Sequence, residues 1–115
     1  MPKPVTLKSA TTGSSYYQMT VQLGEALKTA SNGQITATVE ESQGSVQNVK
    51  EAPKRTGNYV FTSPPSLVKD AQAAKKPFEG ETGYDTIRTL FVMPGITMHF
   101  VTRADANVNS VADLA

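Results

Sequence analysis

The chain has 115 residues, of which 38% are hydrophobic, and its formal net charge is +1 at pH 7. This length suits one domain with a modest core, and the apolar residues fall in blocks that argue against wholesale disorder. The absence of cysteine excludes disulfides, thiolate catalysis and cysteine zinc sites. The lysines and arginines form no dense basic run with interleaved aromatic residues, so the sequence predicts no nucleic-acid partner.

Strand and helix patterns alternate along the chain. Alternating apolar positions predict a strand over 5–10, and apolar residues spaced three to four apart predict a helix from Tyr16 to Ala30. One face of this helix is lined by Tyr16, Met19, Leu23, Ala26, Leu27 and Ala30. The later patterns predict a strand over 35–40, a helix from Val46 that Pro53 bends or ends, and a strand over 59–61. They then predict a helix over 66–74, a polar loop over 75–84, and two extended runs over 86–92 and 96–102.

This order predicts an α/β fold, a doubly wound and mostly parallel sheet with helices on both faces. Ligands of such sheets bind beyond the carboxyl ends of the strands. Three turns fall at that position, over 11–15, 42–45 and 62–65, and each is rich in small hydroxyl residues and opens a helix. Free backbone N–H groups at helix starts attract anions, so the three turns together predict an anion-binding pocket. Each turn alone indicates no more than an ordinary cap.

The two ends of the chain carry further signals. Residues 110–115 read as the first turn and a half of a helix, which Ser110 can cap while Asp113 bonds back to the cap. An isolated helix needs about 12 residues before it is even marginally stable in water, and this one has far fewer. We therefore expect the chain to be the front part of a longer protein. The alternative is a natural stub docked on the core. The start, Met-Pro-Lys-Pro, lacks the apolar centre of a signal peptide. We therefore expect that any export signal was removed or never existed.

Three motifs carry a family resemblance. They are Thr12-Gly13-Ser14-Ser15-Tyr16-Tyr17, then Gly44-Ser45-Val46-Gln47-Asn48, and finally Arg103-Ala104-Asp105 followed by Ser110-Val111-Ala112-Asp113-Leu114. In order and spacing they resemble the TAXI family of TRAP-transporter solute receptors, which are type II periplasmic binding proteins. The resemblance implies that residues 1–103 are an incomplete lobe 1, and that residues 104–115 are the crossover and truncated start of lobe 2.

The resemblance implies ligand capture and no enzymatic activity. Receptors of this family bind a small organic acid or amino acid, such as glutamate, between two lobes and deliver it to TRAP membrane permease subunits. It also implies a periplasmic location. Carried over by position, the ligand-binding residues are Thr12, Gly13, Ser14, Ser15, Tyr16, Gly44, Ser45, Val46, Thr62, Ser63, Met93 and Pro94, the last two at the end of a fourth strand. Ser14 stands where the family usually has glycine, which adds a Cβ where the backbone approaches the ligand.

Other interpretations stay open. An α/β enzyme lobe could hold a phosphorylated or carboxylate substrate, although Ser63 has no evident base except distant His99, the only histidine. A chain with half a cleft could also fold without useful binding, so we expect only weak affinity for acidic amino acids. No P-loop or dinucleotide fingerprint is present, and neither cofactor nor metal is expected. The run over 96–102 is expected to leave a sheet edge unpaired, which predicts edge-strand or swapped dimers.

Overall fold

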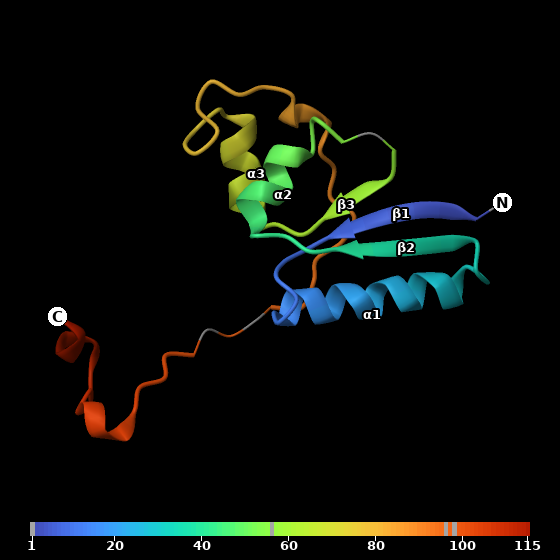
Figure 1. Ribbon diagram of the computed structural model, residues 1–115. Helices are drawn as coiled ribbons and strands as arrows, with labels where there is room; N and C mark the ends of the chain where they lie inside the picture. Colours follow the sequence, from blue (N-terminus) through green and yellow to red (C-terminus); the bar gives the residue numbers. More distant parts are fainter. Residues whose placement is uncertain (1, 56, 96, 98) are drawn as a thin grey trace.

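The computed structural model describes residues 2–55, 57–95, 97 and 99–115 (Figure 1). Its elements in chain order are β1 (Lys3–Lys8), α1 (Ser15–Ala30), β2 (Ile35–Glu40), α2 (Ser45–Glu51), β3 (Tyr59–Phe61), α3 (Pro65–Gln72) and the 3-10 helices η1 (Tyr84–Thr86), η2 (Ala104–Ala106) and η3 (Val111–Leu114). Within these residues, no helix combines the length and the apolar character needed to cross a membrane.

The three strands form one parallel sheet in the order β2-β1-β3. Lys8 at the end of β1 pairs with Glu40 of β2 and with Phe61 of β3. Successive residues of a strand point to opposite faces. Accordingly, Leu7 faces Gly24 of α1, whereas the next residue, Lys8, bonds to Glu51 of α2 on the other face. The predicted α/β fold with a doubly wound parallel sheet is confirmed.

Helix α1 lies close to the sheet because its buried positions are small. Its two buried residues are Thr20 and Gly24. A Cβ at Gly24 would lie 3.2 Å from the Cβ of Ala37 in β2, so the glycine permits this close approach. The predicted apolar face is therefore partly wrong, because it is rotated away from the observed contact: Tyr16 is 41% exposed and Ala26 is also exposed.

The main cluster of buried side chains lies where α2, α3 and the following loop meet. Val49, Ala71, Phe78 and Tyr84 are all buried there. The rings of Phe78 and Tyr84 pack edge to face with centroids 5.3 Å apart. The loop predicted over 75–84 is confirmed up to Gly83, but it is not wholly polar, because Phe78 anchors it to the core.

Element boundaries differ from the predictions where side chains redirect the backbone. Strand β3 covers the predicted residues, whereas β1 begins and ends two residues before its predicted range. The shift at the carboxyl end arises because the carbonyl groups of Ser9 and Ala10 bond to Asn48 and Ser42. Helix α3 also ends earlier than predicted, and Ala74 just beyond it has a positive φ of 54°.

The last part of the chain forms no strand in the residues that the structure describes. Residues 87–95 have no regular secondary structure, so the predicted fourth strand before Met93 and Pro94 is wrong. Residues 97 and 99–102 also lack strand structure, while 96 and 98 lie outside the described residues. Figure 1 shows the final segment, in orange to red, leading away from the sheet. A strand needs a partner for its backbone groups, and the described sheet contains only β1, β2 and β3.

The helical turn predicted near residue 110 is present as η3. The Asp113 Oδ2 atom accepts a hydrogen bond from the Ser110 N–H at 3.1 Å, as the capping pattern predicts. The turn is exposed rather than docked on the core, with Val111 84% exposed. Local capping thus forms this turn without support from buried apolar contacts.

Candidate functional site

The three hydroxyl-rich turns meet at the carboxyl edge of the sheet. The Ser42 N–H donates to the Ala10 carbonyl at 3.0 Å, which joins the second turn to the first. The Thr62 N–H donates to the Lys8 carbonyl at 3.0 Å, and the Thr62 hydroxyl lies 3.3 Å from Ser9 Oγ. These bonds join the third turn to the end of β1. The prediction that the turns share one edge is confirmed.

Asn48 of α2 connects the second and third turns to Ser9 just after β1, a role that no spacing along the chain predicts. Its Nδ2 donates to the Ser9 carbonyl at 2.8 Å and to the Thr62 carbonyl at 2.9 Å. Its Oδ1 accepts a hydrogen bond from the Ser42 hydroxyl. The side chain is fully buried. Asparagine is a poor helix former because its side chain competes for backbone hydrogen bonds. Its position inside a predicted helix is therefore the sequence signal that points to a special role.

The first turn is held at both ends. The Ser14 hydroxyl caps α1 by accepting a hydrogen bond from the Tyr17 N–H at 3.1 Å. The Thr12 N–H donates to Glu41 Oε1 at 3.4 Å, which ties this turn to the end of β2. A Cβ at Gly13 would meet nothing within 4 Å, so the space above this turn is open.

The second turn depends on a glycine conformation. Gly44 has φ 142°, in a region that other residues rarely adopt. As the N-cap of α2 it brings no capping side chain. Its own N–H donates to Ser42 Oγ at 3.0 Å. The backbone at the start of α2 is therefore left uncovered by the cap residue.

A groove of about 1410 Å³ runs along the sheet, from Lys3 and Ile35 at the amino ends of β1 and β2 to Thr62 at this carboxyl edge. Strands β1 and β3 contribute its floor, α1 contributes one wall, and residues 86–95 contribute another. Small-molecule sites are usually about 300–1,000 Å³, so a small ligand would occupy only part of it. Met93 and Pro94 both line the groove, although the described residues before them form no strand.

The residues carried over from the family divide into two groups. Those that line the groove are Tyr16, Gly44, Ser45, Thr62, Ser63, Met93 and Pro94. Those that lie on the same turns without lining it are Thr12, Gly13, Ser14, Ser15 and Val46. Ligand contact by either group stays a prediction.

The groove lining has a one-sided charge. Its described lining contains Lys3, Lys8, Arg55, Lys69 and Arg88 and includes no aspartate or glutamate. Two of these cations are already paired with carboxylates on the far face of the sheet. The remaining lysines and arginine leave the groove with a positive bias, which favours an anion over a cation.

The paired cations belong to an ion cluster that the sequence analysis missed. Lys8 is buried and its Nζ lies 3.0 Å from Glu40 and 2.7 Å from Glu51. Arg55 bonds to both carboxylates and stacks over Tyr59, 4.7 Å from the ring centroid. Each of β1, β2 and α2 ends on a charged residue, Lys8, Glu40 or Glu51, but only the fold brings these three together.

The pKa values in this cluster follow from these contacts. The Arg55 hydrogen bond, followed by that of Lys8, lowers the pKa of Glu40. The Lys8 hydrogen bond lowers the pKa of Glu51. Burial alone would lower the pKa of Lys8, but its bonds to the two carboxylates outweigh burial and raise it. Burial also raises the pKa of Tyr59. All four groups therefore keep their usual charge near neutral pH.

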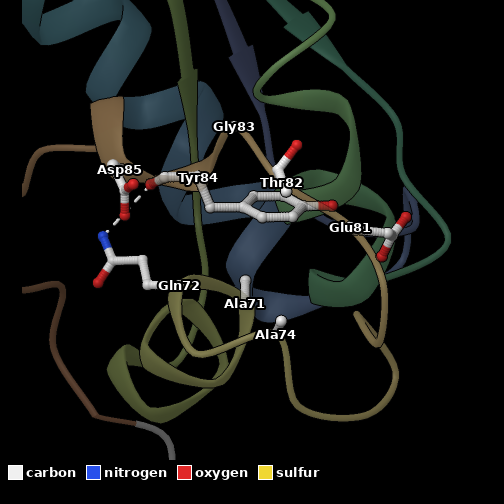
Figure 2. Close-up of a pocket in the computed structure, with 8 residues that line it drawn as sticks. All are labelled: Ala71, Gln72, Ala74, Glu81, Thr82, Gly83, Tyr84 and Asp85. Carbon is white, nitrogen blue, oxygen red and sulfur yellow. Dashed lines mark hydrogen bonds between the residues drawn. The ribbon is translucent and has the colours of Figure 1, made fainter.

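A second, smaller cavity of about 130 Å³ lies between α3 and η1 (Figure 2). The Gln72 Nε2 donates to the Tyr84 carbonyl at 3.3 Å, and Glu81 pairs with Lys50 at 3.4 Å. Burial raises the pKa of the Tyr84 hydroxyl. Two of the polar side chains here are engaged with the protein itself, so the groove is the better candidate site.

The arrangement offers little for catalysis in the described residues. The Ser63 hydroxyl donates to the Pro64 carbonyl at 3.0 Å, and His99 is exposed beyond the groove lining. Nucleophilic serine catalysis needs a base within hydrogen-bond reach of the hydroxyl. No group of three or more histidine, aspartate or glutamate side chains is placed to hold a metal in this part of the chain.

Comparison with known proteins places this site within one family. The model of the NMT1-like family matches residues 7–115. The match includes all three turns, Asn48 and the segment that forms the outer wall of the groove. Neither the comparison with curated proteins nor that with solved structures gave a match.

Proposed function

This chain belongs to the NMT1-like family, whose members are broadly similar to periplasmic binding proteins, and on that premise we propose that it captures a small organic acid. The ligand class proposed is a carboxylate or an acidic amino acid such as glutamate. Binding takes place where the turns after β1, β2 and β3 meet. Capture rather than conversion is proposed, because the Ser63 hydroxyl donates to the Pro64 carbonyl and bonds to no base among the described residues.

The convergence of the three turns is the observation that carries the proposal. Two of them open on the groove through Gly44, Ser45, Thr62 and Ser63. Hydroxyl groups and backbone N–H groups at helix starts are suited to carboxylate oxygens. Because the turns are hydrogen-bonded to one another, these donors are held in place before a ligand arrives. Pre-organised donors lose less entropy on binding.

The charge of the groove supports an anionic ligand. Lys69 at the end of α3 and Arg88 in the outer wall both line it, and no carboxylate is among its described lining residues. A carboxylate or a sulfonate is attracted by this field, whereas an amine is repelled. The open shape leaves part of any ligand exposed to water, so we expect affinity of the 115-residue chain in the millimolar range.

We further propose the role that the three sequence motifs imply, that of a solute receptor of the TAXI type. Such a receptor acts in the periplasm and delivers its ligand to TRAP membrane permease subunits. The motif order from Thr12 to Leu114 supports this role. Uptake of a labelled acid by cells that carry a TRAP permease should require this protein, and uptake that is unchanged without it would contradict this part of the proposal.

Calorimetric titration with L-glutamate tests ligand capture directly. The chain should bind it weakly and should bind L-lysine more weakly still. Charge reversal at the groove, Lys69→Glu, should weaken glutamate binding, whereas Lys28→Glu at the exposed end of α1 should not, since Lys28 lies outside the groove. Equal binding of both amino acids, or equal loss in both variants, would contradict an anion site at this position.

A further inference from the structure

Asn48 is buried out of reach of any ligand, yet it bonds to the second and third turns of the proposed site and to Ser9, just after β1. Its exposed fraction is 0%, and its carboxamide holds the carbonyl groups of Ser9 and Thr62 together with the Ser42 hydroxyl. Both amide hydrogens and the amide oxygen are thereby used. A hydrophobic residue of similar volume could fill the space, but it would take the donor from the Thr62 carbonyl and leave the Ser9 carbonyl only the Thr62 hydroxyl at 3.5 Å.

The two carbonyl bonds fix the direction of the next two N–H groups. In a trans peptide the carbonyl and the following N–H point in opposite directions. Because the Ser9 carbonyl points to Asn48, the Ala10 N–H points away from it, and the same holds for Thr62 and the Ser63 N–H. Ala10 and Ser63 both line the groove. Among the described residues, neither N–H donates a hydrogen bond to the protein.

We propose that Asn48 is the positioning residue of the binding site, and that it aims the Ala10 and Ser63 N–H groups at a carboxylate held in the groove. These two donors come from the ends of neighbouring strands, β1 and β3. Asn48 makes no ligand contact and acts only through the two peptide groups. This inference rests on the proposed function and adds the pair of donors that recognises the anion.

The test uses the 115-residue chain, with Asn48→Ala as the main variant and Asn48→Ser as a milder one. Val49→Ala is the matched control, because Val49 is the next residue of α2 and is equally buried. Backbone amide spectra are recorded first without ligand. The Ala10 and Ser63 amide signals should shift in Asn48→Ala more than that of Leu7, which lies within β1. In Val49→Ala they should shift no more than Leu7.

The second measurement is a titration with L-glutamate followed at the same amides. The wild-type chain should show saturable shifts at Ala10 and Ser63. Asn48→Ala should lower the affinity by about tenfold, as expected for donors no longer held in place, with Asn48→Ser between the two. Val49→Ala should lower the stability of the fold but keep the affinity.

The outcomes separate this inference from the proposed function. Unchanged Ala10 and Ser63 signals in ligand-free Asn48→Ala would overturn the positioning role whatever the chain binds. Wild-type affinity in both Asn48 variants would overturn it as well. If the wild-type chain shows no response to glutamate while the ligand-free signals move as expected, the glutamate proposal fails and the positioning of the two N–H groups stands. If Asn48→Ala does not fold, the Asn48→Ser spectra decide.

Discussion

The body of the molecule, the described residues from 2 to 87, and its arm, the described residues from 88 onward, differ in how far their apolar side chains are buried. In the body, Leu7, Val49 and Phe78 are at most 2% exposed. In the arm, Val92 is 88% exposed and Phe100 is 86% exposed. The radius of gyration, 17.7 Å, exceeds the roughly 13 Å expected for a compact chain of this length. The arm is therefore apolar in sequence without being part of the core.

This contrast shows where the binding-site geometry comes from. The three turns are set by pairing within the body, through parallel register and the bonds of Asn48. The arm contributes to the groove only through 88–95, which line its outer wall without strand pairing. We expect stability and site geometry to respond to changes in the body and to be almost indifferent to changes beyond residue 95.

The largest effect should come from Phe78. Phe78→Ala removes a fully buried ring that packs on Tyr84 and lies 5.6 Å beneath Lys50 Nζ. Removing such a ring costs about 3–5 kcal/mol through lost burial and the cavity left behind. Urea denaturation should show this loss. Phe100→Ala in the arm removes the same side chain where it is exposed and should change stability by less than about 0.5 kcal/mol. If both variants lose the same free energy of unfolding, the arm contributes to the core as much as the body does, and the distinction between them is wrong.

Acid should destabilise the body through its ion cluster. The pKa values of Glu40 and Glu51 are lowered in the folded state, so their contribution is present above the unfolded pKa near 4.5. It is lost as pH falls through the lower folded values. Because solvent screens these partly exposed carboxylates, we expect a loss on the order of 1–2 kcal/mol. In the wild-type chain, the urea midpoint of unfolding should fall as the pH is lowered from 7. In Glu40→Gln, the midpoint should depend less on pH over the same range.

Alkaline pH should also destabilise the body through the same cluster, this time by deprotonating Lys8. The raised pKa of Lys8 gives stability that is complete below 10.5 and is lost as pH rises through the folded value. The exposed Arg103–Asp105 pair of the arm serves as the control. Asp105→Asn should leave the whole pH profile of unfolding unchanged, and a profile altered as much as in Glu40→Gln would refute the assignment to the cluster.

A smaller effect is expected at the helix caps. Ser14→Ala removes the hydroxyl that accepts the Tyr17 N–H and should cost about 1 kcal/mol. Asp113→Ala removes the equivalent bond to Ser110 in the arm. It should leave global unfolding within about 0.5 kcal/mol of wild type, since η3 has no buried contacts to lose. Thermal unfolding measures both, and comparable shifts in melting temperature would count against an independent arm.

The sequence predicted those features that depend on local patterns. Alternation and helical spacing located β2 and α2, and the repeated turns correctly indicated a shared sheet edge. What it missed depends on register across the sheet. The bond from Asn48 to Ser9 and the pairing of Lys8 with Glu51 join positions 39 and 43 residues apart, and no spacing along the chain reveals them.

The arm shows the opposite error. The run over 86–92, most of which lies in the arm, has the composition of a strand, and this composition alone predicts one. Strand propensity mainly reports how well a side chain fits a pleated and partly buried surface. Leu90 and Val92 have no such surface in the described structure, where each is more than two thirds exposed. A strand prediction therefore needs a predicted neighbour as well as a favourable pattern.

The weakest effect, and the one that tests the arm itself, concerns self-association. We propose that the exposed arm of one copy pairs with the outer edge of β3 in a second copy, because β3 ends the sheet and the arm carries unburied Phe100 and Val101. Light scattering should show partial dimer at high concentration. Phe100→Lys should reduce it, whereas Val111→Lys, equally exposed but in η3, should not. If the chain is strictly monomeric at millimolar concentration, the arm does not pair with a second copy of this chain.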